Sequence, residues 1–276
     1  MTTDATDTTE ATPDTLEPRA PLDVSVIKAV AFDAYGTLFH WDFLLAVQEV
    51  LDQQGLGGDH EQVAKTFQDE AFRKVSVWAQ DGTLDETQDG TEEDARLRRK
   101  RLTDGPPPPW IATWETWRRQ FEYTFAKYEL AGDPVAGANH LRHVLSHAPS
   151  YPDAFESIER IAQKYLVGLL ANADEDFQQS AESVNRLRFS VIQSSESLRI
   201  YKPNRAAFLA LAERFSCEPH EVLYVGDTPG ADVSGAVNAG LRAAYVRRNE
   251  AEYPKETALP DIETRSLEAI ADAIMA

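Results

Sequence analysis

Aspartates close two short apolar runs of the sequence, where the strands of a parallel sheet would end. Asp33 follows the run 24–32, and Asp227 follows the run Val222–Gly226. Because ligands of open α/β sheets bind at the carboxyl ends of the strands, we expect both carboxylates at one site. Asp232 lies five residues beyond Asp227. Together the three carboxylates could hold a hard cation such as Mg2+, which prefers oxygen ligands.

Two of these aspartates also have a purely structural interpretation. Asp33 could cap a helix after the strand, and Asp232 could lie in a first helical turn, where the helix dipole favours a carboxylate. Thr37 could add a hydroxyl donor near an anion. Lys202 precedes Pro203, which predicts a helix whose first residue is this proline. A lysine there would point toward the same edge of the sheet.

The apolar runs predict a doubly wound, Rossmann-like α/β domain. The run 24–32 is rich in β-branched residues, which is typical of a strand buried on both faces. Four similar runs follow, and helical stretches at 203–215 and 230–239 alternate with the last of them. Such alternation is typical of a doubly wound parallel sheet. The four later runs are 165–171, 189–193, Val222–Gly226 and Arg242–Val246.

The segment 41–150 has helical spacing instead, and we expect it to form a helical domain inserted after the first strand. Apolar residues recur at helical spacing in 43–51 and 63–75 and again between positions 110 and 128. The core domain would then consist of 21–40 and 151–276. The rest of the expected organisation is a disordered acidic tail at 1–20, a polar loop at 81–93, and a basic stretch at 96–101 that is ended by the prolines 106–109.

The charge of the chain argues against nucleic acid as a partner. The sequence has 46 acidic and 27 basic residues, which gives a net charge of −19. Duplex binding needs clustered lysine and arginine, so the basic stretch at 96–101 is better explained as a solvated helix face.

The cysteine content and the start of the sequence bear on location. Cys217 is the single cysteine, which excludes an internal disulfide and a thiolate zinc site and fits a reducing compartment. Residues 1–20 lack the basic start and apolar run of a secretory signal. No stretch approaches the roughly 20 apolar residues that span a bilayer. We therefore expect a soluble, cytoplasmic protein with no membrane contact.

Taken together, these residues resemble the haloacid dehalogenase superfamily, whose hydrolases use an aspartate nucleophile. The stretch 32–39, Phe-Asp-Ala-Tyr-Gly-Thr-Leu-Phe, is similar to the family's first motif, which places the nucleophile at Asp33 and the motif's threonine at Thr37. Lys202 with its proline is similar to the lysine motif. The Gly-Asp pair at Asp227, with a further aspartate five residues on, is similar to the terminal acidic motif. The inserted helices look like the helical C1-type cap of subfamily I, and the return to the core at 151–154 also resembles relatives.

The resemblance implies covalent catalysis. Asp33 would attack phosphorus, or an sp3 carbon that bears a halide, and water would then hydrolyse the intermediate. Members of the family that transfer phosphoryl groups bind Mg2+. The resemblance implies that Asp33, Asp227, Asp232 and the backbone carbonyl of Tyr35 would bind it in this chain. Lys202 would supply positive charge to the developing oxygens. The cap would exclude water and contact the variable part of the substrate.

Departures from the family pattern leave two reactions open. Tyr35 stands where the family's phosphatases carry a second aspartate as general acid, and a tyrosine there is typical of its 2-haloacid dehalogenases, which need neither metal nor a protonated leaving group. The Gly-Asp form at Asp227 is instead the metal-binding, phosphatase-like version. Phe208 stands where a dehalogenase tyrosine is expected. Ala171 lacks the hydroxyl of the family's serine or threonine, and Asn172 could supply a donor in its place.

We therefore expect a Mg2+-dependent phosphatase of a small phosphorylated metabolite, because two carboxylates without a cation would repel each other in a desolvated site. A metal-independent 2-haloacid dehalogenase, favoured by Tyr35, is the alternative. A non-catalytic binding protein with the same fold, suggested by Ala171, is a third. The substrate is expected to be a small anion contacted by Arg73, Trp114 and Arg118.

Aromatic residues of the inserted segment could shape the substrate site. Trp110, Trp114 and Trp117 are spaced by four and three residues, which predicts one shared helix face. That face could be core packing, a substrate wall or the contact of a homodimer. His40 and Trp41 could line the entrance or make an ordinary hinge contact.

Overall fold

The computed structural model of the protein describes the greater part of the chain. The tail expected at 1–20, apart from its last residue, lies outside the described residues, and so do Arg73, the polar loop at 81–93 and nearly all of the basic stretch. Among the helices that are described, none combines the length and the apolarity needed to cross a membrane. The described residues are 20–68, 100, 102–107, 109–250, 252–255 and 257–276.

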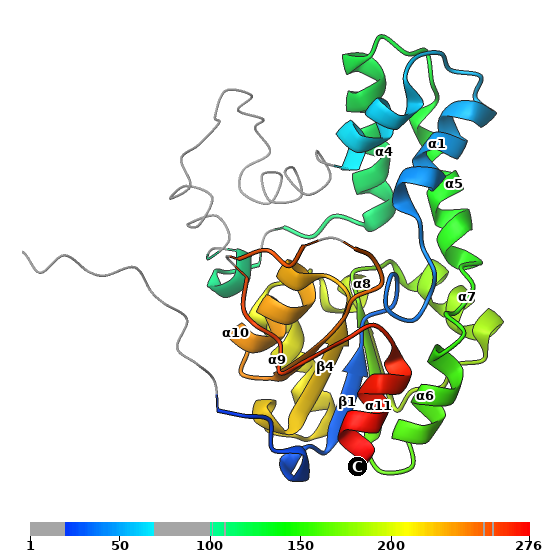
Figure 1. Ribbon diagram of the computed structural model, residues 1–276. Coiled ribbons are helices and arrows are strands. Elements are labelled where there is room, and N and C mark those ends of the chain that lie inside the picture. Colours follow the sequence, from blue (N-terminus) through cyan, green and yellow to red (C-terminus); the bar gives the residue numbers. More distant parts are fainter. Residues whose placement is uncertain (1–19, 69–99, 101, 108, 251, 256) are drawn as a thin grey trace, which may run out of the picture.

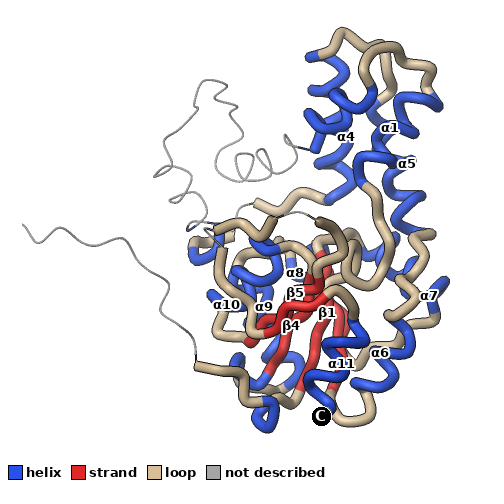
Figure 2. Tube along the Cα trace, viewed as in Figure 1, coloured by secondary structure: helices blue, strands red, loops and turns tan. Residues whose placement is uncertain are grey.

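Six parallel strands form a sheet in the order β3-β2-β1-β4-β5-β6. Figure 2 shows these strands at the centre of the core, with helices on both sides. The chain winds outward from β1 first toward β3 and then toward β6, which confirms the doubly wound fold. The strands are β1 (Ala29–Phe32), β2 (Leu166–Ala171), β3 (Val191–Ser194), β4 (Val222–Gly226), β5 (Arg242–Val246) and β6 (Ile262–Thr264).

Both faces of the sheet are buried under helices, as expected for a parallel sheet with apolar strands. Side chains that alternate along β1 show this division: Val30 and Phe32 pack with α6, α7 and α11, whereas Ala29 and Ala31 pack with α9 and α10. All four residues of β1 are inaccessible to solvent. The core helices are α6 (Ala154–Ile161), α7 (Glu175–Asn185), α8 (Ser195–Leu198), α9 (Arg205–Phe215), α10 (Gly235–Asn238) and α11 (Leu267–Met275).

Most of the described helical segments between β1 and β2, α6 excepted, form a second group, which we call the helical module. It consists of α1 (Phe43–Gln53), a helical stretch at 60–68, α4 (Thr113–Lys127) and α5 (Pro134–Ser146). Figure 1 shows it above the sheet domain. The rings of Phe67 and Phe121 lie 4.4 Å apart in its interior. A side chain at Gly137 would come within 2.8 Å of the Phe121 ring, so this glycine permits α5 to pack closely on α4.

Two of the crossings between the helical module and the sheet domain lie side by side. The amide of His40 donates to the carbonyl of Pro149 over 2.7 Å, and the amide of Tyr151 donates to the carbonyl of Leu38 over 2.8 Å. The outgoing and returning chains are thus hydrogen-bonded side by side. The predicted domain limits at 41 and 150 fall at these crossings and stay a prediction.

Several predicted element limits are wrong for local reasons. The run 24–32 contains a 3-10 helix, Val24–Val26, because the Asp23 side chain accepts from the Ser25 amide and caps this turn. The helix after Lys202 begins at Arg205, where the Asn204 side chain caps it, so Pro203 is not helical. The helix predicted at 230–239 is divided into a π-helical turn, Pro229–Ser234, and α10. The sequence analysis also missed β6 and α11.

Candidate active site

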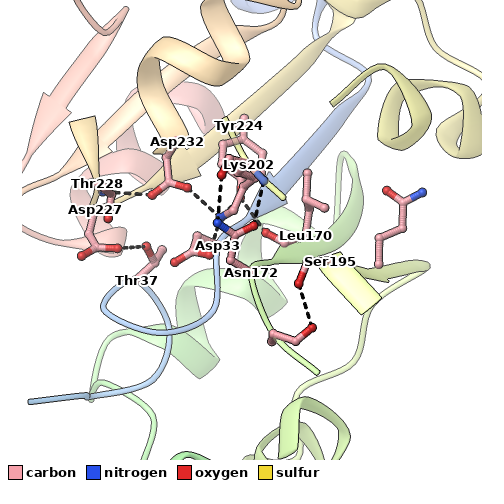
Figure 3. Close-up of polar contacts among 12 residues, drawn as sticks. Asp33, Thr37, Leu170, Asn172, Ser195, Lys202, Tyr224, Asp227, Thr228 and Asp232 are labelled. Carbon is pink, nitrogen blue, oxygen red and sulfur yellow. Dashed lines mark hydrogen bonds and ion pairs between the residues drawn. The ribbon is translucent and has the colours of Figure 1, made fainter. Parts of the chain in front are cut away.

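The ammonium group of Lys202 joins three side chains from β1, β4 and the loops that follow them (Figure 3). Its Nζ lies 2.5 Å from Oδ1 of Asp33, 2.7 Å from Oδ1 of Asp232 and 2.8 Å from the hydroxyl of Tyr224. Lys202 and Asp232 are almost completely buried, and Asp33 is 8% exposed. Since an ammonium group has three hydrogens, all of them are engaged in these bonds. The structure therefore brings Asp33, Lys202 and Asp232 together, as the sequence predicted.

Asp227 completes the cluster of carboxylates. Thr37 donates its hydroxyl to Oδ1 of Asp227 over 3.0 Å, and Oδ2 of Asp232 accepts from the backbone amide of Thr228 over 2.9 Å. One carboxylate oxygen from each of Asp33, Asp227 and Asp232 lies within 4.8 Å of the other two. The site thus holds three carboxylates around one lysine.

Two glycines allow the carboxylates to approach the strand ends. Gly36 has φ of +94°, a conformation that favours glycine, and a Cβ there would lie 2.4 Å from Oδ2 of Asp227. A Cβ at Gly226 would lie 2.3 Å from Cβ of Asp232. The glycines in both motifs are therefore required by the close packing of the loops around the acidic cluster.

Burial and mutual repulsion perturb the carboxylates. Burial raises the pKa of Asp33 to about 6, although the Lys202 ammonium opposes this shift. Desolvation, followed by the charges of Asp33 and Asp232, raises the pKa of Asp227 well above its usual value. One lysine thus does not neutralise the site, and Asp227 favours either a proton or a further cation.

The raised pKa of Asp33 predicts a pH dependence. Since the folded state binds this proton more tightly than the unfolded chain, the contribution of Asp33 to stability is greatest at low pH and is lost as the pH rises through about 6. Only the carboxylate can attack a substrate, so turnover should rise over the same interval. Carboxyl carbon NMR of the metal-free protein, with Asp33→Asn to assign the signal, measures this directly. Titration of Asp33 at the usual pH of an exposed aspartate would contradict the expectation.

Asn172 lies beside Lys202 and fixes the backbone of that residue. Its Oδ1 accepts from the amide of Lys202 over 2.8 Å, and its Nδ2 donates to the carbonyl of Lys202 over 3.1 Å. These two bonds tie the loop after β2 to the turn that carries Lys202. The contacts support a positioning role for Asn172 and leave its role as a replacement donor for Ala171 a prediction.

Tyr35 directs its phenol toward the helical module. The hydroxyl donates to the carbonyl of Leu145 over 3.4 Å, a long hydrogen bond, and the ring lies 5.9 Å from that of Phe177. The ring of Trp117 stacks on Phe177 at 5.6 Å. Tyr35, Phe177 and Trp117 therefore form an aromatic contact between the sheet domain and the helical module.

The predicted substrate contacts have other partners in this structure. The guanidinium of Arg118 is paired with Glu115 at 2.8 Å and with Glu122 at 3.2 Å. The indole nitrogen of Trp114 donates to Asn139 over 2.9 Å. Substrate contacts by Arg118 and Trp114 stay predictions, and Arg73 lies outside the described residues.

The prediction that three tryptophans share one helix face is wrong. The helix α4 begins at Thr113, after Ala112, so Trp110 precedes it. The ring of Trp110 lies instead under the guanidinium of Arg199, 4.0 Å from its centre.

His40 and Trp41 line a cavity of about 330 Å³ between α1 and the end of α5, together with Glu49, His143 and His147. This cavity lies at the crossings between the two parts of the chain. The structure therefore favours the hinge interpretation for His40 and Trp41.

Asp174, which the sequence analysis missed, lies in the sheet domain and caps α4 of the helical module. Its two carboxylate oxygens accept from the backbone amides of Thr113 and Trp114 over 2.8 and 2.9 Å, where Ala112 provides no cap for α4. Tyr201 donates its hydroxyl to the carbonyl of Ile111 over 2.7 Å. Residues beside Asn172 and Lys202 thus hold the start of α4.

Removing this cap should loosen α4 at its first turn. We expect Asp174→Ala to lower the free energy of unfolding by about 1–2 kcal/mol, because two helix amides lose their acceptor. Hydrogen exchange at Thr113 and Trp114 should accelerate. Asp133→Ala is the matched control, since Asp133 caps α5 from within the helical module through the amides of Val135 and Ala136. If the amides of Thr113 and Trp114 exchange at the same rate in Asp174→Ala and Asp133→Ala, the role given to Asp174 is contradicted.

A family model describes this arrangement of strands and motifs. The model for haloacid dehalogenase-like hydrolases matches residues 27–240, which include every residue of the acidic cluster and Lys202. The chain belongs to the haloacid dehalogenase-like hydrolases. It is accordingly a hydrolase of this family, while the subfamily and the C1 type of cap stay predictions.

Relatives in the family include both kinds of enzyme. The chain is 26% identical to the (S)-2-haloacid dehalogenase of Xanthobacter autotrophicus over 81% of its own length and 76% of that enzyme. It is 26% identical to (S)-2-haloacid dehalogenase 4A of Burkholderia cepacia, over 51% of the chain and 62% of that enzyme. It is also 32% identical to a phosphoserine phosphatase of Thermus thermophilus, over 44% of the chain and 50% of that enzyme.

Solved structures share the fold over nearly the whole chain. The L-2-haloacid dehalogenase of Xanthobacter autotrophicus superposes with a TM-score of 0.68 at 21% identity, and the alignment covers 91% of this chain and 99% of that one. The magnesium-bound HAD-hydrolase YfnB of Bacillus subtilis gives the same TM-score at 18% identity, again covering 91% and 99%. At these identities the likeness supports the HAD fold and does not distinguish the two reactions.

Proposed function

We propose that the protein is a Mg2+-dependent phosphatase that transfers the phosphoryl group of a small metabolite to Asp33 and then to water. The observation that carries this proposal is the cluster of Asp33, Asp227 and Asp232, in which one oxygen from each lies within 4.8 Å of the other two beside a single lysine. The two ion pairs of Lys202 in the described part of the chain are those with Asp33 and Asp232, and Asp227 lies outside them. Asp227 is therefore the carboxylate that needs a further cation.

The residues present fit a magnesium ion. Carboxylate oxygens are hard ligands. Burial, followed by the negative charges of Asp33 and Asp232, raises the pKa of Asp227, and a cation would offset those charges. Asp33, Asp227 and Asp232, with the backbone carbonyl of Tyr35, would hold the ion. When bound, Mg2+ would reduce the repulsion between the attacking carboxylate and a phosphate dianion.

The side chains of the chain itself would perform two chemical steps. A carboxylate oxygen of Asp33 forms a bond to phosphorus as the bond to the ester oxygen breaks, which gives an aspartyl phosphate and an alcohol. Water then attacks phosphorus, releases inorganic phosphate and regenerates the carboxylate. Lys202 orients Asp33 before attack and offers positive charge to the phosphoryl oxygens.

The leaving group receives its proton from solvent in this proposal. The Tyr35 phenol contacts the Leu145 carbonyl, and phenols have an ordinary pKa near 10, which makes Tyr35 a weak acid for this task. Substrates whose alcohol leaves easily should therefore be hydrolysed fastest.

A 2-haloacid dehalogenase is the second candidate, and the position of Tyr35 favours it. A halide leaves without a proton, so this reaction does not need an aspartate at the position of Tyr35. Asp33 would displace the halide from carbon to form an ester, and water would attack the carboxyl carbon of Asp33. The relatives whose names contain haloacid dehalogenase also support this candidate.

Turnover of phosphate esters and 2-haloacids with and without metal separates the candidates. We expect phosphate release that requires Mg2+ and disappears with EDTA. Asp227→Asn should abolish the stimulation by Mg2+, whereas it should leave halide release intact. Halide release that EDTA does not change, with no phosphatase activity, would replace the first candidate by the second.

A further inference from the structure

Tyr224 is a buried side chain of β4 that neither proposed reaction uses. It is 1% exposed, and its hydroxyl lies 2.8 Å from Nζ of Lys202 and 2.7 Å from the carbonyl oxygen of Leu170. Because a carbonyl can only accept, the phenol must donate its hydrogen to Leu170. The same oxygen then accepts a hydrogen from the Lys202 ammonium. Burial also raises the pKa of Tyr224 well above its ordinary value, which keeps the hydroxyl protonated.

The order of the strands and a small residue in β1 allow the Tyr224 side chain to reach from β4 across β1 to β2. Leu170 belongs to β2, and β1 lies between β2 and β4. The residue of β1 that pairs with Tyr224 is Ala31, which lies in the same buried cluster on this face. Its methyl group leaves room for the Tyr224 ring to reach β2. The hydroxyl is therefore anchored to the backbone of a strand on the far side of the nucleophile strand.

Packing on the other side fixes the ring of Tyr224. Phe208 of α9 meets it edge to face at 5.0 Å. A side chain at Gly235 would come within 2.5 Å of the Phe208 ring, so this glycine permits Phe208 to occupy its position. The phenol is thus held by a ring contact and by a hydrogen bond to the backbone.

We propose that Tyr224 is a positioning residue that fixes the direction of the Lys202 ammonium toward Asp33. The other two acceptors of Lys202, Asp33 and Asp232, are carboxylates that a substrate or cation would engage. Tyr224 is the neutral acceptor, and its place does not depend on ligands. It holds Nζ in position while the contact with Asp33 changes during the reaction.

The proposal rests on catalysis through Asp33 and deepens the proposed function, so its test has two readouts. In Tyr224→Phe one ammonium hydrogen loses its acceptor. We expect the Lys202 ammonium protons, observed by nitrogen-correlated NMR, to exchange with water faster. We also expect kcat to fall about tenfold with little change in KM, which is the effect of one hydrogen bond on the transition state.

Tyr165→Phe is the matched control. Tyr165 is also buried and donates to a backbone carbonyl, that of Ile274, over 2.7 Å, but it lies at the opposite end of the sheet. Both variants should shift the midpoint of unfolding similarly, and only Tyr224→Phe should change the ammonium signal. An unchanged ammonium signal and unchanged kcat in Tyr224→Phe would overturn the proposal. If the wild-type protein hydrolyses neither class of substrate, the NMR comparison still decides the role of Tyr224 while the proposed function fails.

Discussion

Asp33→Asn should reduce turnover of any substrate by about 10⁴-fold or more, because the amide cannot serve as the nucleophile in either proposed reaction. The fold should persist, since Lys202 keeps its ion pair with Asp232 at 2.7 Å. Steady-state rates with phosphate esters and 2-haloacids measure the effect.

A surface substitution controls for the loss of one negative charge. Glu213→Gln on the exposed side of α9 should leave activity unchanged. Substantial activity in Asp33→Asn, with the variant folded and free of deamidation, would show that another group attacks the substrate.

Lys202→Met should have the second largest effect, on both stability and activity. Asp33 and Asp232 would remain buried without their cation, and breaking such a buried pair costs about 3–5 kcal/mol of unfolding free energy. Activity should fall by about 100- to 1000-fold, because the positive charge beside the reacting group is lost. Denaturant unfolding and initial rates measure the two effects.

The pH dependence of stability distinguishes a charge effect from lost packing. Because the pKa of Asp33 is raised to about 6, Asp33 is protonated at low pH, and Lys202→Met should lower the free energy of unfolding less there than at neutral pH. Lys164→Met is the control, because Lys164 is exposed and its ammonium donates to the carbonyl of Ile274 over 3.2 Å, with no carboxylate partner among the described residues. If Lys202→Met lowers the free energy of unfolding only slightly, and by the same amount at every pH, the central role of the Lys202 ion pairs is contradicted.

Local patterns predicted the residues of the acidic cluster well. Asp33, Lys202, Asp227 and Asp232 each follow a recognisable apolar run or motif, and parallel strands bring their carboxyl ends to one edge. The limits of Val222–Gly226 and Arg242–Val246 were also predicted correctly, because their runs are apolar and end at turns. What the sequence predicted is therefore the part of the site that lies close to the strand ends.

Contacts between distant segments could not be predicted in this way. Asp174 caps α4 across a separation of sixty residues, and nothing in its own surroundings indicates which helix it serves. Tyr224 looks like an ordinary strand residue until the order of β2, β1 and β4 is known. Trp110, the first of the three tryptophans, fits the helical period but precedes the helix, because α4 starts where Asp174 provides acceptors. Tertiary partners decide these features.

The covalent bond to Asp33 is the central claim, and its most direct test is the mass of the peptide that contains this residue. Turnover is quenched with acid, the protein is digested, and the peptide is compared with the same peptide from Asp33→Asn. We predict an adduct on Asp33 with the mass of a phosphoryl group. With labelled water, heavy oxygen should appear in the released phosphate. An active wild-type enzyme whose Asp33 never carries substrate atoms or label from water, even in rapid-quench samples, would contradict the account.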